Sequence, residues 1–499
     1  MKQFRLFGVL ALALAISMPA FAETQTVKVS GSIDAYWAYR ADFDLSEGND
    51  VALVPVNGTT VEALGFDADS HNGQGAQSDS ANFWFSLVQV EVAADLTDNV
   101  AVVVNLFNQR DWNATSFAAS SSGFTTAQDD EFDVGVDLAY IELKQIFYEP
   151  LSVVVGRFDI EFGRGFVLGN WNIQDPNSSL TLDEYSAVTS YDGGYAVLDF
   201  NPWTVHFVGL NLRQGAVNAE DDRNFFFTNI NYQFSEYNAE WELYFGYDHN
   251  RIADTSGAAV GSTREAAKDS STYLVGTRAQ YDPIEPLTLG AEVGFQFGQQ
   301  ETATTTGVLA GPTPAGQSRE AWAFDLFGEY RWSEHAYTPY VGLEYVYLGG
   351  DQTDTTEYEG WNGLFRSPTY GIINDYLETY YQTALVGDSS TSTNHQHLSV
   401  SGGFAPMDDL KIDGVFYWFW TEEDVFNTTG SVSSENVGQE KGSELDIFLT
   451  YDYTEDVTFG VSFAWFFPGE IYDQASKGTF NGPLNDEATA ITGHVGVAF

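Results

Sequence analysis

Apolar and polar side chains alternate along most of this chain, in runs of about ten to fourteen residues. The alternation is clearest in residues 287–298, where Leu, Leu, Ala, Val, Phe and Phe take every second position and Thr, Gly, Glu and Gln fill the others. Successive side chains of a β-strand point to opposite faces, so each run has one apolar and one polar face. Many long runs of this kind are typical of a transmembrane β-barrel, whereas a soluble sandwich seldom shows so many uniform strands.

Eighteen segments follow the alternation, and an even number lets an antiparallel barrel close with both chain ends on one side. They span residues 27–40, 82–95, 100–110, 132–145, 151–158, 190–200, 203–212, 224–235, 239–250, 271–282, 287–299, 319–332, 337–348, 396–405, 410–420, 443–454, 457–466 and 488–499. We therefore expect an all-β fold, a transmembrane antiparallel β-barrel of about 18 strands.

The connections between these segments alternate between short and long. Short ones such as 96–99, 201–202 and 406–409 are rich in Pro, Asn or Asp, as tight turns require. Long ones such as 159–189 and 349–395 fall between them. This alternation predicts short periplasmic turns and long extracellular loops.

The first 22 residues have the pattern of a secretory signal peptide. Lys2 and Arg5 precede an apolar stretch over 6–16, and Ala20-Phe21-Ala22 forms a small-x-small cleavage site. We expect residues 23–499 to form a single barrel domain. No second apolar run approaches the roughly 20 residues that a membrane helix needs, so strands are expected to make the contact with outer-membrane lipid.

The composition narrows the functions that such a barrel can have. The chain has 71 acidic and 20 basic residues, and its formal net charge of −51 argues against nucleic acid as a partner. It has no cysteine and hence no disulfide framework. Its 38 Phe, 27 Tyr and 12 Trp suit the aromatic girdles of a barrel. A circumference of about eighteen strands leaves an aqueous channel.

The final segment places Phe499 on the apolar face, together with Ile491 and Val495. A terminal aromatic residue in this position resembles the signal that the barrel assembly machinery reads in outer-membrane proteins. We therefore expect Phe499 to serve as the assembly signal. An ordinary strand end is the alternative interpretation.

The polar faces of the strands place charges of both signs in the predicted lumen. Such charges either form pairs that stabilise the wall or form a constriction that selects solutes. The residues that we consider for the constriction on these faces are Glu292, Asp325, Glu329, Arg331, Glu444 and Asp446.

Two connections have patterns of their own. Residues 162–166 read Phe-Gly-Arg-Gly-Phe, which joins flexible glycines to Arg164 and two rings, and this loop either folds into the barrel or caps its surface. In the connection after Leu348, Tyr376, Tyr380 and Tyr381 have a helical spacing. That spacing predicts a short helix at the barrel rim, or an aromatic patch that guides solutes.

Catalytic motifs do not accompany these features. The sequence contains neither a G-x-S-x-G elbow nor an H-E-x-x-H metal helix. His395 and His397 would share one face of a strand, but a polar strand entrance is the more ordinary explanation than a metal site. We expect no enzyme activity, no cofactor and no metal.

Three stretches resemble the alginate-export type of outer-membrane barrel. They are 155–165 with 191–193, which read VGRFDIEFGRG and YDG; 363–365 with 370–375, which read GLF and YGIIND; and 444–446 with 451 and 467–469, which read ELD, Y and FPG. The resemblance implies an eighteen-stranded channel in the bacterial outer membrane. Arg157, Arg164 and Arg366 match or adjoin these stretches, which implies a local cationic site in the pore.

The sequence therefore predicts a porin through which small hydrophilic solutes diffuse passively. The excess of acidic residues favours cations, or at most weak selectivity. Two alternatives remain open at this point. One is an export channel for an acidic, alginate-like polysaccharide, and the other is a non-conducting receptor or adhesin that acts through its long loops.

Overall fold

A computed structural model describes the barrel and parts of its connections. The described residues are 26–43, 45, 53–56, 59–62, 80–112, 134–169, 185–186, 188–213, 222–252, 268–300, 317–352, 355–363, 369–377, 393–424, 438–472 and 485–499. The predicted signal peptide, Arg366, Tyr380 and Tyr381 lie outside these residues.

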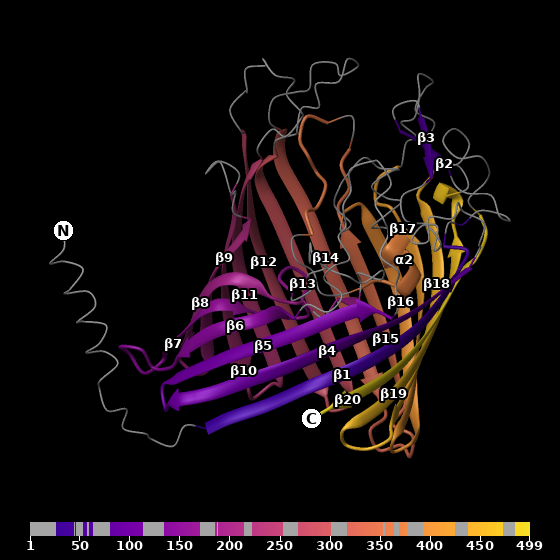
Figure 1. The fold of residues 1–499 in the computed structure, drawn as a ribbon. Coiled ribbons are helices and arrows are strands. Elements are labelled where there is room, and N and C mark those ends of the chain that lie inside the picture. Colours follow the sequence, from indigo (N-terminus) through magenta and orange to yellow (C-terminus); the bar gives the residue numbers. More distant parts are fainter. Residues whose placement is uncertain are drawn as a thin grey trace, which may run out of the picture.

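Eighteen antiparallel strands close into one barrel, as predicted (Figure 1). Each strand pairs with the barrel strand before and after it in the chain, and β1 closes the ring by pairing with both β4 and β20. A separate hairpin, β2 (Leu53–Val56) and β3 (Thr59–Glu62), lies outside the barrel sheet. The barrel strands are β1 (Thr26–Ala41), β4 (Ser80–Thr97), β5 (Val100–Asp111), β6 (Gly135–Leu143), β7 (Leu151–Phe158), β8 (Tyr191–Asp199), β9 (Trp203–Arg213), β10 (Arg223–Phe234), β11 (Ala239–Ile252), β12 (Lys268–Ile284), β13 (Leu287–Gln300), β14 (Gln317–Arg331), β15 (Tyr340–Leu348), β16 (His395–Met407), β17 (Leu410–Trp420), β18 (Glu440–Asp452), β19 (Val457–Pro468) and β20 (Ala488–Ala498).

The two ends of the barrel differ in their connections. Short turns, for example residues 98–99, 285–286 and 408–409, join strands at one end, which we call the turn end. The strand ends that the long connections join lie at the other end, the loop end, as the sequence predicts. Phe499 lies at the turn end (Figure 1). Among the described residues, no helix is long and apolar enough to cross a membrane.

Exposure alternates along the strands in the predicted sense. On β14, Trp322 is 53% exposed, whereas its neighbours Ala321 and Ala323 are buried. The same alternation leaves Val27 and Val29 of β1 exposed on the outward, lipid-facing side. Phe499 is also exposed and continues the outward face of β20, so its predicted orientation is confirmed; its role as an assembly signal stays a prediction.

The inward face is less uniformly polar than the alternation of the sequence predicts. Towards the loop end, buried rings of the wall form one apolar cluster with residues of the connections. Phe158, Phe225 and Phe227 come from strands, whereas Phe166 and Trp361 come from connections. The reason is that connecting segments enter the barrel, so apolar side chains on both partners are removed from water.

Strand length varies around the wall. β7 has 8 residues and its neighbours β6 and β8 have 9 each. In contrast, β4 has 18 residues and β12 has 17. Two connecting segments fill space inside the barrel: residues 159–169, which follow β7 and which we call the inward loop, and residues 369–377, which contain the short helix α2 (Ile372–Leu377) and which we call the α2 segment.

Candidate functional site

A row of charged side chains crosses the inner wall. In the strand register, Glu242 of β11 lies opposite Arg278 of β12, Arg278 opposite Glu292 of β13, and Glu292 opposite Asp325 of β14. Directly opposite residues share a face with their Cβ atoms roughly 5 Å apart, so these four side chains are neighbours. Together with the nearby acids Glu240 and Glu344 we call them the charge belt.

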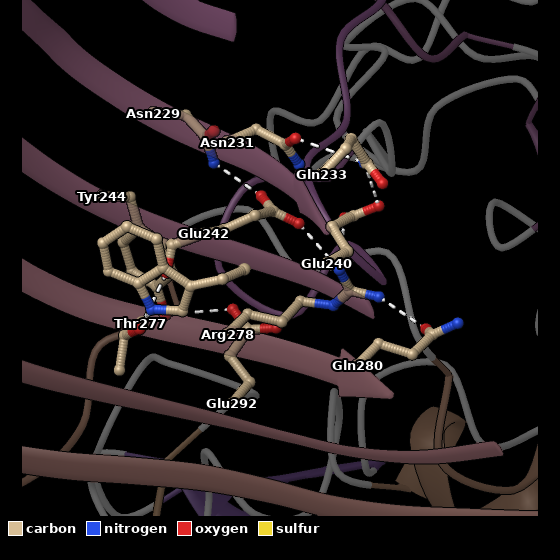
Figure 2. A network of polar contacts seen from close by, with 11 residues as sticks. Asn229, Asn231, Gln233, Glu240, Glu242, Tyr244, Thr277, Arg278, Gln280 and Glu292 are labelled. Atoms are coloured by element: carbon tan, nitrogen blue, oxygen red, sulfur yellow. Dashed lines mark hydrogen bonds and ion pairs between the residues drawn. The ribbon is translucent and has the colours of Figure 1, made fainter. Parts of the chain in front are cut away.

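Arg278 is the centre of the belt on its β11 side (Figure 2). Its Nη1 contacts Glu240 Oε1 at 2.8 Å and Glu242 Oε1 at 2.7 Å, and its Nη2 donates to Gln280 Oε1 at 2.8 Å. Asn229 Nδ2 donates to the other oxygen of Glu242 at 2.6 Å. This arginine therefore holds two carboxylates that would otherwise repel each other.

Tyr244 supports the next carboxylate along the belt. Its hydroxyl donates to Glu292 Oε1 at 3.0 Å, across the intervening strand β12 (Figure 2). The register partner of Tyr244 is Gly276, where a Cβ atom would overlap the tyrosine ring. Because residue 276 has no side chain, the ring can lie across β12 and reach Glu292. Tyr244 is not recognisable from the sequence, since an aromatic residue on an inward face gives no signal of its own.

The inward loop places Arg164 on the β14–β15 side of the belt. Its Nη1 contacts Asp325 Oδ2 at 2.7 Å and its Nη2 contacts Glu344 Oε1 at 2.6 Å. The guanidinium also lies over the ring of Phe327, 4.1 Å from the ring centre. Two separate strands therefore bind one loop arginine. These contacts confirm that the loop folds inward and does not cap the surface.

A left-handed glycine sets the path of this loop. Gly163 has φ of 60°, a conformation that other residues seldom adopt. A Cβ atom there would come within 2.7 Å of Arg278 Cδ. A backbone bond from the Gly165 amide to the Phe162 carbonyl, at 2.9 Å, closes the turn. The loop backbone thus rests directly on the charge belt, and Gly163 allows that approach.

Glu444 and Asp446 have a different role from the one predicted. Glu444 is fully buried, and its two carboxylate oxygens accept from the backbone amides of Ile373 at 2.7 Å and Asn374 at 2.8 Å. Asp446 Oδ2 accepts from the amide of Ile372 at 3.3 Å. These acids therefore anchor the first turn of α2, whose amides have no partner within the helix. The prediction of a short helix is confirmed for residues 372–377, which cover the two acids from within the barrel. Tyr380 and Tyr381 lie outside the described residues, so the alternative of an aromatic patch is not tested.

Two histidines and a lysine connect this region with the charge belt. Lys441 Nζ lies 2.9 Å from His395 Nδ1, and His395 Nε2 lies 2.9 Å from His397 Nδ1. His397 Nε2 then lies 3.8 Å from Glu344 Oε2. All three residues are buried. Within the described part of the chain, no group of three or more His, Asp or Glu side chains is arranged to hold a metal ion.

The remaining candidates lie away from the belt. Glu329 and Arg331 pair with each other at 2.8 Å near the turn end, where both side chains are substantially exposed.

Arg157 does not face the lumen. It alternates with the buried, inward Val154 and Phe158 and shares the outward face of β7 with Val155, which is 55% exposed. The predicted pore role of Arg157 is therefore wrong, because strand alternation turns it outward to contact Asp192 at 3.1 Å.

The fold is similar to that of solved structures from Pseudomonas aeruginosa. OccK8 (OprE) is 11% identical, with 95% of this chain and 98% of that chain covered and a TM-score of 0.49. OccK1 (OpdK) is 12% identical, with 95% and 99% covered and a TM-score of 0.48. OccK2 (OpdF) is 10% identical, with 95% and 99% covered and a TM-score of 0.48.

A comparison with curated protein sequences finds no match. A family model described as Alginate export matches residues 64–482, which is most of the chain. The matched region includes the inward loop, the charge belt and the α2 segment. With the closed 18-stranded barrel, this match shows that the protein is a bacterial outer-membrane channel that belongs to the alginate export family.

Proposed function

We propose that the protein is a passive channel for small hydrophilic solutes and that it prefers cations to anions. The observation that carries the proposal is the composition of the charge belt beneath the inward loop. Five carboxylates, those of Glu240, Glu242, Glu292, Asp325 and Glu344, surround two guanidinium groups, those of Arg278 and Arg164. A surplus of negative charge inside a narrow passage attracts cations and repels anions.

The distribution of the pairs strengthens this interpretation. Arg278 contacts Glu240 and Glu242, and Arg164 contacts Asp325 and Glu344, so each arginine is shared by two acids. Glu292 has Tyr244 as its hydrogen-bond donor among the described residues. The acidic surface of the whole chain, with a formal net charge of −51, acts in the same direction within a Debye length of about 8 Å.

Planar-bilayer recordings under a KCl gradient test the proposal directly. A cation-preferring channel gives a stable open current and a reversal potential displaced towards the equilibrium potential of K⁺. A reversal potential displaced towards that of Cl⁻ would contradict the preference for cations. The absence of any current from correctly folded barrel would contradict the channel itself and favour a receptor or adhesin.

Export of an acidic polysaccharide is the second candidate, and the family match favours it. A polyanion would need unpaired cationic groups along its path. In the described lumen, Arg164, Arg278 and Arg331 each contact a carboxylate instead. The same recordings separate the two functions, because polyanion export predicts an anion preference and a block of the current by added polyuronate.

A further inference from the structure

We propose that Glu292 and Asp325 bind a divalent cation between them, beneath the inward loop. This inference rests on the proposed channel function in one respect only: a bound cation would reduce the negative charge of the belt and hence the preference of the channel for cations. Binding itself is a property of the folded barrel and can be measured without any current.

The geometry of the two carboxylates is the first argument. Glu292 and Asp325 are register partners on β13 and β14, so their side chains lie next to each other on the inward face. Each residue is only 3% exposed. Two buried carboxylates on directly opposite residues of neighbouring strands repel each other unless a positive group lies near them or one of them takes up a proton.

The hydrogen bonds of the pair are the second argument. Glu292 Oε1 accepts from Tyr244, and Asp325 Oδ2 accepts from Arg164. The other oxygen of each group, Glu292 Oε2 and Asp325 Oδ1, is buried and has no hydrogen-bond partner among the described residues. A buried carboxylate oxygen without a partner is costly, and ligation of a cation removes that cost.

The inward loop closes over this position. A Cβ atom on Gly163 would lie 3.5 Å from Glu292 Oε2, so the loop backbone approaches the unpartnered oxygen closely. The two nearby arginines make their ion pairs with other oxygens: Arg278 Nη1 contacts Glu240 and Glu242, and Arg164 contacts Oδ2 of Asp325, while Arg278 Nε lies near the loop without a hydrogen-bond partner among the described residues. Neither guanidinium forms a hydrogen bond with Glu292 Oε2 or Asp325 Oδ1 among the described residues, and the belt as a whole has five acids for two arginines, a surplus that a doubly charged ion would reduce.

The donor set indicates the kind of ion. Carboxylate oxygens are the preferred ligands of Ca²⁺, which takes six to eight oxygens and accepts water for some of them. Two carboxylates supply fewer ligands than a dedicated metal site, in agreement with the lack of a three-residue cluster among the described residues. We therefore expect a weak site, with half-saturation by Ca²⁺ at about 0.1 to 1 mM.

Thermal unfolding of the detergent-folded barrel, titrated with CaCl2 at constant ionic strength, tests the site. We expect Tm of the wild-type protein to rise with Ca²⁺, because the ion binds only the folded state. Glu292→Gln and Asp325→Asn each remove one charged ligand while keeping the side-chain shape. Each should raise the half-saturating Ca²⁺ concentration by about tenfold or more. Either variant alone is sufficient if the other does not fold.

Glu329→Gln is the matched control, since Glu329 is another lumen-side acid of β14 but pairs with Arg331 near the turn end. It should keep the wild-type response to Ca²⁺. An unchanged Tm in the wild type, or an equal response in all variants, would overturn the proposal and assign the two oxygens to water or a shared proton. A wild-type barrel that shows the Ca²⁺ response but conducts no current would support the site and contradict only the channel function.

Discussion

The inward loop and the α2 segment both enter the barrel and both are held by buried acids, but the acids bind different groups. Asp325 and Glu344 hold the loop through the guanidinium of Arg164. Glu444 holds α2 through two backbone amides. The first attachment therefore depends on the charge of one side chain, whereas the second is made by backbone amides, although the side chains of Ile373 and Asn374 are themselves buried.

This difference means that the two attachments should affect stability and ion selectivity differently. A guanidinium contributes charge to the passage as well as attachment, so changing Arg164 alters both the loop position and the electric field. Backbone amides carry only partial charges, and they satisfy a fully buried acid with little effect on the field. We therefore expect substitutions in the α2 anchor to act mainly on stability and substitutions in the inward loop to act also on ion preference.

The largest effect is expected from Glu444→Ala. The substitution removes the acceptor for the amides of Ile373 and Asn374 and leaves a cavity, which should lower the free energy of unfolding by about 3 kcal/mol. Thermal unfolding of the detergent-folded barrel measures the loss. Glu444→Gln keeps the volume and one good acceptor oxygen, so it should lose less. Equal stability of the alanine variant and the wild type would show that α2 is held by other contacts.

Arg164→Ala should have the second largest effect on stability and the largest on selectivity. It leaves Asp325 and Glu344 without their guanidinium. The free energy of unfolding should fall by about 2 kcal/mol, which is less than for a fully buried ion pair, because the side chain of Arg164 is 36% exposed. With one positive charge removed, the K⁺ to Cl⁻ permeability ratio should rise by about twofold or more. Reversal potentials measure the change. Arg164→Lys is the control that keeps the positive charge without the planar guanidinium. An unchanged K⁺ to Cl⁻ permeability ratio in the alanine variant would exclude Arg164 from the passage.

Gly163→Ala tests whether the loop path, independently of charge, sets the passage. The new Cβ would meet Arg278 in a left-handed backbone conformation, so the loop must shift, at a cost of about 1 kcal/mol. We expect altered single-channel conductance with an unchanged sign of ion preference. Gly209→Ala is a suitable control, because a Cβ there would make only ordinary contacts with Phe226.

The smallest effect is expected from Arg331→Ala. Arg331 and Glu329 form an exposed pair, and such pairs contribute about 0.5 kcal/mol or less. Tm should change little, and the reversal potential should move only slightly towards cations. A change as large as that of Arg164→Ala would place the selective region at the turn end and contradict the importance of the inward loop.

The alternation of side chains was sufficient to predict the barrel. All eighteen strands, the inward orientation of Glu292 and Asp325 and the outward orientation of Phe499 follow from it, because a lipid face and a wet face impose a period of two on every strand. The sequence left the direction of the inward loop open, since glycines on both sides of Arg164 allow the backbone to turn sharply but do not show whether it turns into the barrel or over its surface.

Other features depend on contacts between distant segments and have no local signal. Arg157 was misplaced because a motif shows that residues occur together, whereas only the strand phase shows which face each one occupies. Glu444 has the pattern of any lumen acid, and only the position of α2 shows that it accepts backbone amides. Tyr244 reaches Glu292 across a strand because residue 276 is glycine, a coincidence of register that one strand alone does not reveal.

The short strands β6, β7 and β8 also have a consequence for the surrounding bilayer. An eight-residue strand extends about 27 Å, and a tilt of roughly 45° reduces its height across the membrane to about 19 Å. The apolar band of such barrels is about 25 Å tall. Lipid beside β6–β8 therefore meets a lower wall than lipid beside β4 or β12, and the Arg157–Asp192 pair lies at the loop-end edge of that wall. We expect the outer membrane to be locally thinned along this side, so that the protein has a preferred lateral orientation towards its lipid neighbours.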